Sequence, residues 1–118
     1  MTDIYLAWST SVNSALVALD DSEVSRLNLL VTFVSMDKWL KCPAKDRQFA
    51  KTMLDSGAFS AYNSGDVVDI AELEAEVATG KWDESVALDV IGDAEASLCN
   101  AQRMAPLGSM PVFHIGDP

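Results

Sequence analysis

Acidic residues follow or interrupt two apolar segments of this sequence, and a histidine lies in a third. Asp55 comes directly after residues 52–54, and Asp89 interrupts a second apolar run. The third run ends with His114 and Gly116. A carboxylate or an imidazole can transfer protons to and from a reacting group, and an ionised carboxylate accepts hydrogen bonds from the N–H groups of a bound base. These residues are therefore the first candidates for chemistry.

Most of these residues also have an ordinary structural interpretation. Asp55, Ser56 and Gly57 can form a simple turn, since Asp and Ser bond to nearby backbone and glycine accepts a positive φ. His114 lies between two apolar residues and can be a core histidine. Asp89 is harder to explain in this way, because a buried carboxylate without a partner is costly. Asp89 is therefore the stronger candidate for a functional role.

Strand-like and helix-like segments alternate along the chain. Branched and aromatic apolar runs predict strands at residues 4–8, 27–36, 52–54, 85–90 and 110–115. Helical spacing and capping residues predict helices at residues 12–19, 37–40, 70–79 and 94–105, with a further turn or two over 46–51. Because hairpin signals are few, the alternation predicts an α/β fold of parallel strands. Functional groups then gather beyond the carboxyl ends of the strands.

Composition limits the class of protein further. The 118 residues, 49% of them hydrophobic, predict one domain with a real core over residues 1–118. A net charge of −10 argues against strong nucleic-acid binding by this chain alone. Two cysteines and one histidine are too few for a zinc site. We expect reduced thiols and a cytoplasmic location, since the sequence shows neither an export signal nor an apolar run of membrane-spanning length.

Several blocks of the sequence occur in the order seen in one known family. They are DIYLAWS at residues 3–9, LDSGAFSAYNSG at 54–65, VALDVIGDAEASLCNAQRMAPLG at 86–108 and PVFHIGDP at 111–118. Together they resemble the tRNA-guanine transglycosylase (queuine tRNA-ribosyltransferase) superfamily, in particular its phage branch, whose members insert 7-deazaguanine bases into DNA. The resemblance implies a cytoplasmic protein of a bacterial or phage-infected cell. It also implies the first part of a (β/α)8 TIM-type barrel, with about five parallel strands and outer helices.

The resemblance also implies a role for individual residues. The block that begins at Asp55 aligns with the family's DSGGFQ, so Asp55 would perform acid–base work at the sugar and base undergoing exchange. A pocket for the base would contain Ser56, Gly57, Phe59, Asp89, His114 and Gly116. Phe59 would stack on the base and Asp89 would read its guanine edge. His114 replaces a glutamine of the bacterial tRNA enzymes.

Other parts of the family's machinery lie beyond the region of resemblance. The nucleophilic aspartate and the Cys/His zinc site belong to the second half of the barrel, so we expect no cofactor in this chain and no exchange by it alone. The expected partners are tRNA or DNA, a 7-deazaguanine base, and a second chain or copy that covers the strands at the edges of the sheet.

Two other functions stay open at this point. A hydrolase on a barrel scaffold would use Asp55 and Asp89 as a carboxylate pair, roughly 5–10 Å apart across a sugar. A non-catalytic remnant would bind a base or a partner chain.

Overall fold

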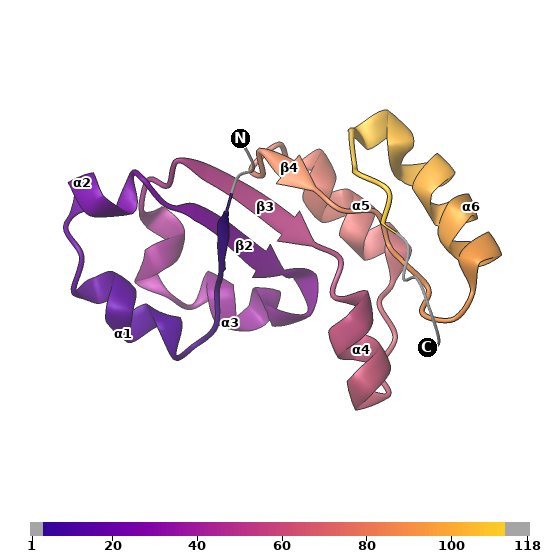
Figure 1. The fold of residues 1–118 in the computed structure, drawn as a ribbon, viewed down its shortest axis with the longest axis horizontal. Helices are drawn as coiled ribbons and strands as arrows, with labels where there is room; N and C mark the ends of the chain where they lie inside the picture. Colours follow the sequence, from indigo (N-terminus) through magenta and orange to yellow (C-terminus); the bar gives the residue numbers. More distant parts are fainter. Residues whose placement is uncertain (1–3, 113–118) are drawn as a thin grey trace.

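Four parallel strands form the sheet of this protein in the order β1-β2-β3-β4, which is also their order along the chain (Figure 1). The computed structural model describes residues 4–112. The strands are β1 (Tyr5–Ala7), β2 (Asn28–Thr32), β3 (Lys51–Asp55) and β4 (Glu84–Ser85). The predicted α/β class with parallel strands is therefore confirmed.

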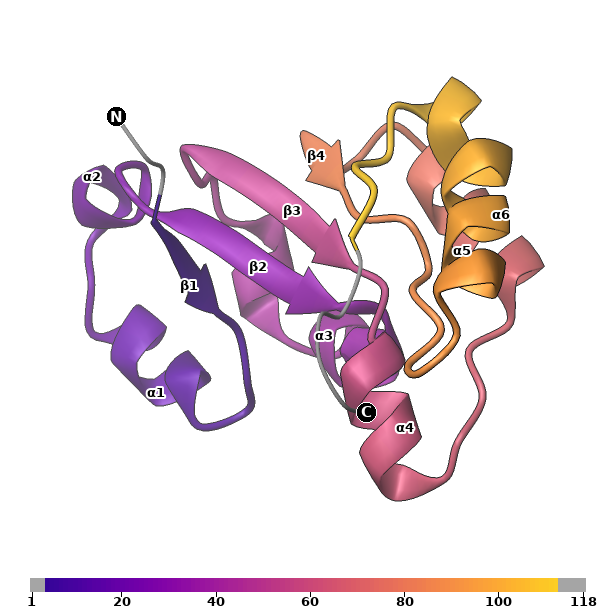
Figure 2. The same ribbon diagram turned by 45° about the vertical axis from the view of Figure 1, so that its right-hand side comes forward.

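Helices occupy every connection between the strands. They are α1 (Val12–Val17), α2 (Asp21–Val24), α3 (Met36–Leu40), α4 (Ala58–Ser64), α5 (Ile70–Ala78) and α6 (Ala94–Met104). Short 3₁₀ helices span Phe33–Ser35, Pro43–Asp46 and Ala105–Leu107. Figure 2 shows α3 behind β2 and β3, and α5 and α6 together beside β4.

Two of these helices begin at an acidic cap. The side chain of Asp69 accepts the backbone N–H groups of Ala71 at 2.8 Å and Glu72 at 3.3 Å. The side chain of Asp93 accepts the N–H of Ala96 at 3.0 Å. Both caps satisfy donors that a helix cannot satisfy internally, and both were predicted from the sequence.

The sheet has one fully buried face and one partly exposed face. Leu29, Val31 and Leu54 are each 0% exposed and pack into the hydrophobic core. Leu30 and Met53, which alternate with them and pair in register, are only half-buried. Because side chains alternate across a strand, the helices cover the first face much better than the second.

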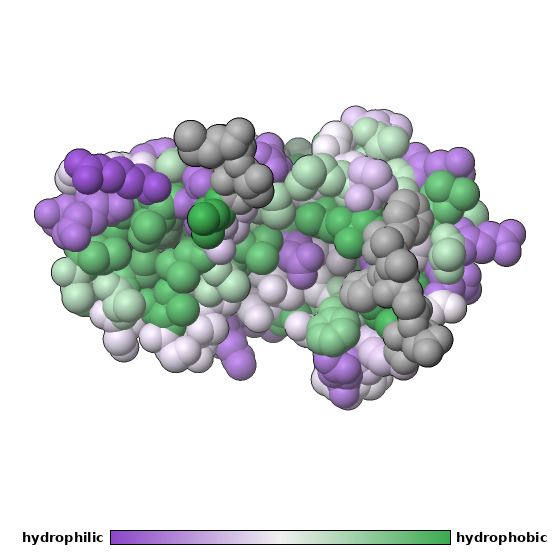
Figure 3. Space-filling model, in the orientation of Figure 1, coloured by the Kyte–Doolittle hydropathy of each residue, from purple (hydrophilic) through white to green (hydrophobic). Residues whose placement is uncertain are grey.

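Apolar side chains are exposed around β1. In Figure 3, hydrophobic residues gather over the region of β1, α1 and α2. Exposed side chains there include Ile4 at 84%, Leu6 at 37% and Val17 at 78%. Within residues 4–112, β1 pairs with β2 alone, so its other edge is an unpaired strand with apolar neighbours.

The long strand predicted over residues 27–36 is a correction. The strand ends at Thr32, and a 3₁₀ turn and α3 follow it. Met36 and Trp39, three positions apart, are both buried against the core. Helical spacing of these large side chains prevails over the strand preference of the apolar run.

The later strands also differ from the prediction. The strand expected over 85–90 is limited to Glu84–Ser85, and a single parallel bridge then joins Val86 to Met110, where the fifth strand begins. Residues 113–115 of that fifth strand lie outside the described residues. Residues 87–90 leave the ladder because their side chains pack against α6, where the N–H of Leu88 contacts the sulfur of Met104.

The remaining differences concern short helices. α2 and α4 were not predicted, since neither has a long apolar period. The turn expected over 46–51 lies earlier, at Pro43–Asp46, where proline suits the first position of a helix. Cys42 and Cys99 are free thiols, as expected. Within residues 4–112, no helix combines the length and the apolar character needed to cross a membrane.

Candidate functional site

Asp55 is the last residue of β3 and lies beside Thr32 in the sheet register. It is half-buried, and its Oδ2 accepts the backbone N–H of Gly57 at 3.1 Å. Gly57 has φ +79°, and a Cβ there would lie 2.8 Å from Cγ1 of Val34. Both conformation and space therefore require glycine at this position. The turn holds Asp55 at the carboxyl end of its strand.

Ser56 completes the same turn. It is 3% exposed, and its hydroxyl accepts the N–H of Ala58, the first residue of α4, at 3.3 Å. Asp55 and Ser56 thus both bond to the backbone within two residues, as the structural interpretation of this tripeptide predicts. The turn therefore explains Ser56 and Gly57 without a ligand.

Asp89 is the most deeply buried of the candidate acids. It is 5% exposed, and its Oδ1 accepts the hydroxyl of Ser97 at 2.5 Å. Ser97 is 2% exposed, lies in the first turn of α6, and accepts the N–H of Val90 at 2.8 Å. This serine therefore fixes both the carboxylate and the backbone that follows it. The sequence analysis missed Ser97, although a serine just after the cap Asp93 was a usable signal.

A small cavity of about 200 Å³ lies in front of Asp89. Its lining comes from α4, from the loop after α4 and from the segment after β4: Ala58, Ala61, Tyr62, Asp66, Val67, Val68, Leu88, Asp89, Val90 and Ile91. The walls are mostly apolar, and Tyr62 adds an aromatic ring that is 52% exposed. Because drug-sized pockets measure roughly 300–1,000 Å³, this cavity suits a single small ring.

The structure separates some residues that the sequence analysis grouped. Of the described side chains that line the cavity, Asp89 is one, but Asp55 and Phe59 are not. Phe59 is 57% exposed on α4, and Tyr62, one turn further, provides the aromatic ring of the cavity instead. His114 and Gly116 lie outside the described residues.

Metal ligation has no candidate cluster among residues 4–112. There, no three side chains of His, Cys, Asp or Glu converge in a way that could hold an ion. Comparisons with protein-family models, with curated proteins and with solved structures gave no match for this chain. The candidate site therefore stands on its own geometry and on the sequence blocks described above.

Proposed function

We propose that this chain forms the base-binding part of a base-exchange transglycosylase, which replaces guanine in tRNA or DNA with a 7-deazaguanine base. One observation carries this function: the carboxylate of Asp89, only 5% exposed, lines a small cavity with mostly apolar walls. A buried carboxylate in such a place is costly unless it is matched by donors. A purine edge can supply those donors.

The chemistry of guanine fits this cavity. Its N1–H and exocyclic N–H point the same way, so they can both donate to one carboxylate, and such charge-assisted bonds are strong. Ser97 orients the carboxylate through its bond to Oδ1. Tyr62 offers a ring beside the same cavity, on which a planar base can pack.

Asp55 serves in this function as the group that transfers a proton to the departing base. The N–H of Gly57 holds its Oδ2 at the end of β3. Displacement of a base also needs a nucleophile at the anomeric carbon of the ribose, and one carboxylate cannot perform both tasks at once. The nucleophile is assigned to sequence outside this chain, and no step is assigned to zinc. The isolated chain then binds a base without exchanging it.

The arrangement of strands supports a partial TIM-type barrel for this function. Neighbours in the sequence are neighbours in the sheet, and Met110 continues the parallel series through its bridge to Val86. The half-buried face that holds Leu30 and Met53 would line the barrel interior. The apolar edge at β1 would pair with a strand of a second chain or copy.

A non-catalytic base-binding protein is the second candidate. The bonds within the turn from Asp55 to Ala58 favour it, because they give the turn a structural purpose. A carboxylate-pair hydrolase has less support, since Asp55 does not line the cavity of Asp89 within the described part of the chain.

Calorimetric titration of the purified chain with 7-deazaguanine tests the proposed function. We expect saturable binding that Asp89→Asn weakens by about tenfold or more, because hydrogen bonds to a charged group contribute about 1.5–3 kcal/mol. Hypoxanthine, which lacks the exocyclic amino group, should bind more weakly than guanine. Asp37→Asn, on an exposed position of α3, is the matched control. Equal binding by wild type and Asp89→Asn would remove the base pocket from this cavity.

A further inference from the structure

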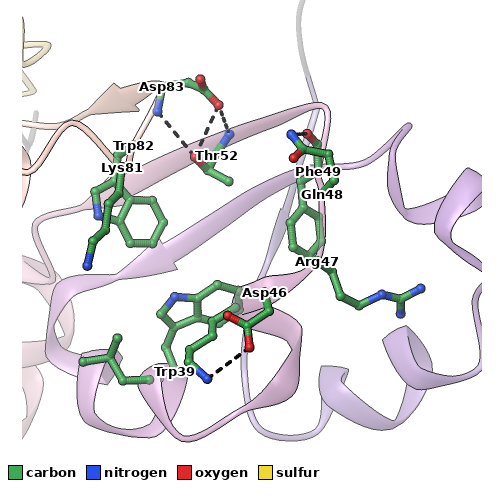
Figure 4. Close-up of a pocket in the computed structure, with 11 residues that line it drawn as sticks. Trp39, Asp46, Arg47, Gln48, Phe49, Thr52, Lys81, Trp82 and Asp83 are labelled. Atoms are coloured by element: carbon green, nitrogen blue, oxygen red, sulfur yellow. Dashed lines mark hydrogen bonds and ion pairs between the residues drawn. The ribbon is translucent and has the colours of Figure 1, made fainter.

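A second and larger cavity, of about 440 Å³, lies near the amino end of β3 (Figure 4). Thr52 and Asp83, at the starts of β3 and β4, form one side of it, and residues of α3 and the loop after it form the other. Asp55 and Asp89 belong to the opposite, carboxyl ends of these strands. This cavity is therefore separate from the candidate base pocket.

Three aromatic rings border this larger cavity. Figure 4 shows Trp82 and Phe49 on two sides of it, with Trp39 between them. The ring centroid of Trp39 lies 6.4 Å from that of Trp82 and 6.5 Å from that of Phe49. Trp39 and Phe49 are 5% and 6% exposed, whereas Trp82 is half-buried. Trp82 is therefore the ring that a ligand can reach.

Hydrogen bonds hold Trp82 in place before any ligand arrives. Its indole N–H donates to Oε2 of Glu76 at 2.9 Å. The next residue, Asp83, accepts the N–H of Thr52 at 2.8 Å, and its own N–H donates to the hydroxyl of Thr52 at 3.4 Å. The polar atom of the indole is thus satisfied, and its ring is positioned for contact. Such preorganisation lowers the entropic cost of binding.

Cations are concentrated at this cavity in a chain of net charge −10. Lys45, Arg47 and Lys81, out of eight Lys and Arg residues, contribute to its lining. The guanidinium of Arg47 is committed elsewhere, because it donates to the carbonyls of Leu16 and Leu19 and pairs with Asp21. Figure 4 shows it pointing away from the rings.

The remaining charges leave one cation available. Asp83 is engaged by Thr52, and Lys45 lies 3.4 Å from the exposed Asp46. The ammonium of Lys81 has no ion pair within the described part of the chain, and Figure 4 shows its side chain beside the indole of Trp82. A reachable ring and an available ammonium therefore lie next to each other.

We propose that this cavity binds a planar aromatic anion of the nucleotide type. The base packs on the ring of Trp82, and the phosphate pairs with Lys81. Lys45, at the same cavity, adds positive charge beside the phosphate. Neither group suffices alone, because a single exposed ion pair contributes little and one half-buried ring offers limited contact area. Affinity and selectivity come from their combination.

Tryptophan fluorescence during titration with AMP tests this binding site. Trp39 and Trp82 both line the cavity, so we expect saturable quenching. Adenosine and inorganic phosphate should each bind at least about tenfold more weakly than AMP, and Lys81→Glu should weaken AMP binding by a similar factor. Lys41→Glu, an exposed charge change outside the cavity, is the control and should stay within about twofold of wild type at moderate salt.

AMP also separates this site from the proposed base pocket. Adenine lacks the paired N–H donors that suit Asp89, so Asp89→Asn should leave AMP binding unchanged. Loss of AMP binding in Asp89→Asn would place the nucleotide in the smaller cavity and overturn the second site, while leaving the base pocket intact. The second site is also overturned by the absence of saturable quenching, by equal binding of adenosine and AMP, or by equal losses in Lys81→Glu and Lys41→Glu.

Discussion

The two cavities of this chain flank the same sheet but differ in size, lining and charge. The smaller one, about 200 Å³, has aliphatic walls and contains Asp66 and Asp89. The larger one, about 440 Å³, is bordered by three aromatic rings and by Lys45, Arg47 and Lys81. A buried acid selects N–H donors, whereas an available ammonium beside a ring selects an aromatic anion. One small sheet thus supports two sites of opposite preference.

The two cavities also depend on different helices. Ser97 of α6 orients Asp89, and Glu76 of α5 orients Trp82. A single bidentate ion pair joins these helices: Arg103 of α6 donates to both carboxylate oxygens of Glu74 of α5, at 3.1 and 2.6 Å. The cavities are therefore separate in their local support but share the strand β3 and the α5–α6 contact.

The largest effect is expected from Leu54→Ala. Leu54 is 0% exposed in β3, the strand that carries both Thr52 and Asp55, so its truncation should weaken both cavities together. We expect a loss of about 2–5 kcal/mol in the free energy of unfolding, measured by urea denaturation. Val67→Ala, at a side chain that is 92% exposed, should change it by less than about 0.5 kcal/mol. Survival of either cavity's binding at full strength in Leu54→Ala would contradict the shared dependence on β3.

A smaller and one-sided effect is expected from Gly57→Ala. Both Gly57 and Gly65 have φ +79°, but a Cβ would lie 2.8 Å from Val34 at Gly57 and would meet nothing within 4 Å at Gly65. We expect a loss of about 2–4 kcal/mol for Gly57→Ala and about 1 kcal/mol for Gly65→Ala, since crowding adds to the backbone strain.

Ligand binding by the folded fraction of Gly57→Ala sharpens the comparison between the cavities. Binding of 7-deazaguanine should fall, because Gly57 starts α4, which forms one wall of the smaller cavity. Binding of AMP should persist. Equal stability losses in Gly57→Ala and Gly65→Ala would show that Val34 moves aside without cost.

The smallest effect is expected from Arg103→Ala, which breaks the link between α5 and α6. The Arg103 side chain is 51% exposed, so the pair should contribute about 0.2–1 kcal/mol, and less as salt is added. Urea denaturation at low and high salt measures this contribution, and Arg26→Ala, at an exposed arginine, is the control. A salt-independent loss would mean that packing of the Arg103 stem, and not its charge, joins the helices.

Local features of the structure were predictable from the sequence. The caps Asp69 and Asp93 depend on bonds to residues two or three positions away. The turn after Asp55 likewise depends on Gly57, and its position after an apolar strand was predicted correctly. Such interactions involve few residues, so they survive without knowledge of the rest of the fold.

Other features depended on contacts between distant segments. The end of β2 at Thr32 follows from the burial of Met36 and Trp39 in the core, which an apolar run alone does not reveal. Tyr62, and not Phe59, lines the smaller cavity because the direction of α4 relative to the segment after β4 decides which face of the helix is turned toward Asp89.

The sequence by itself therefore determined the alternation of strands and helices, the parallel class, and the placement of acids at strand ends. Periodicity, capping and turn chemistry act over a few residues, and they are written directly in the chain. Only the tertiary structure decided that Ser97 holds Asp89, and that Lys81 and Trp82 meet Trp39 and its neighbours across a second cavity. These partners come from separate elements, and packing of the elements on a shared sheet brings them together.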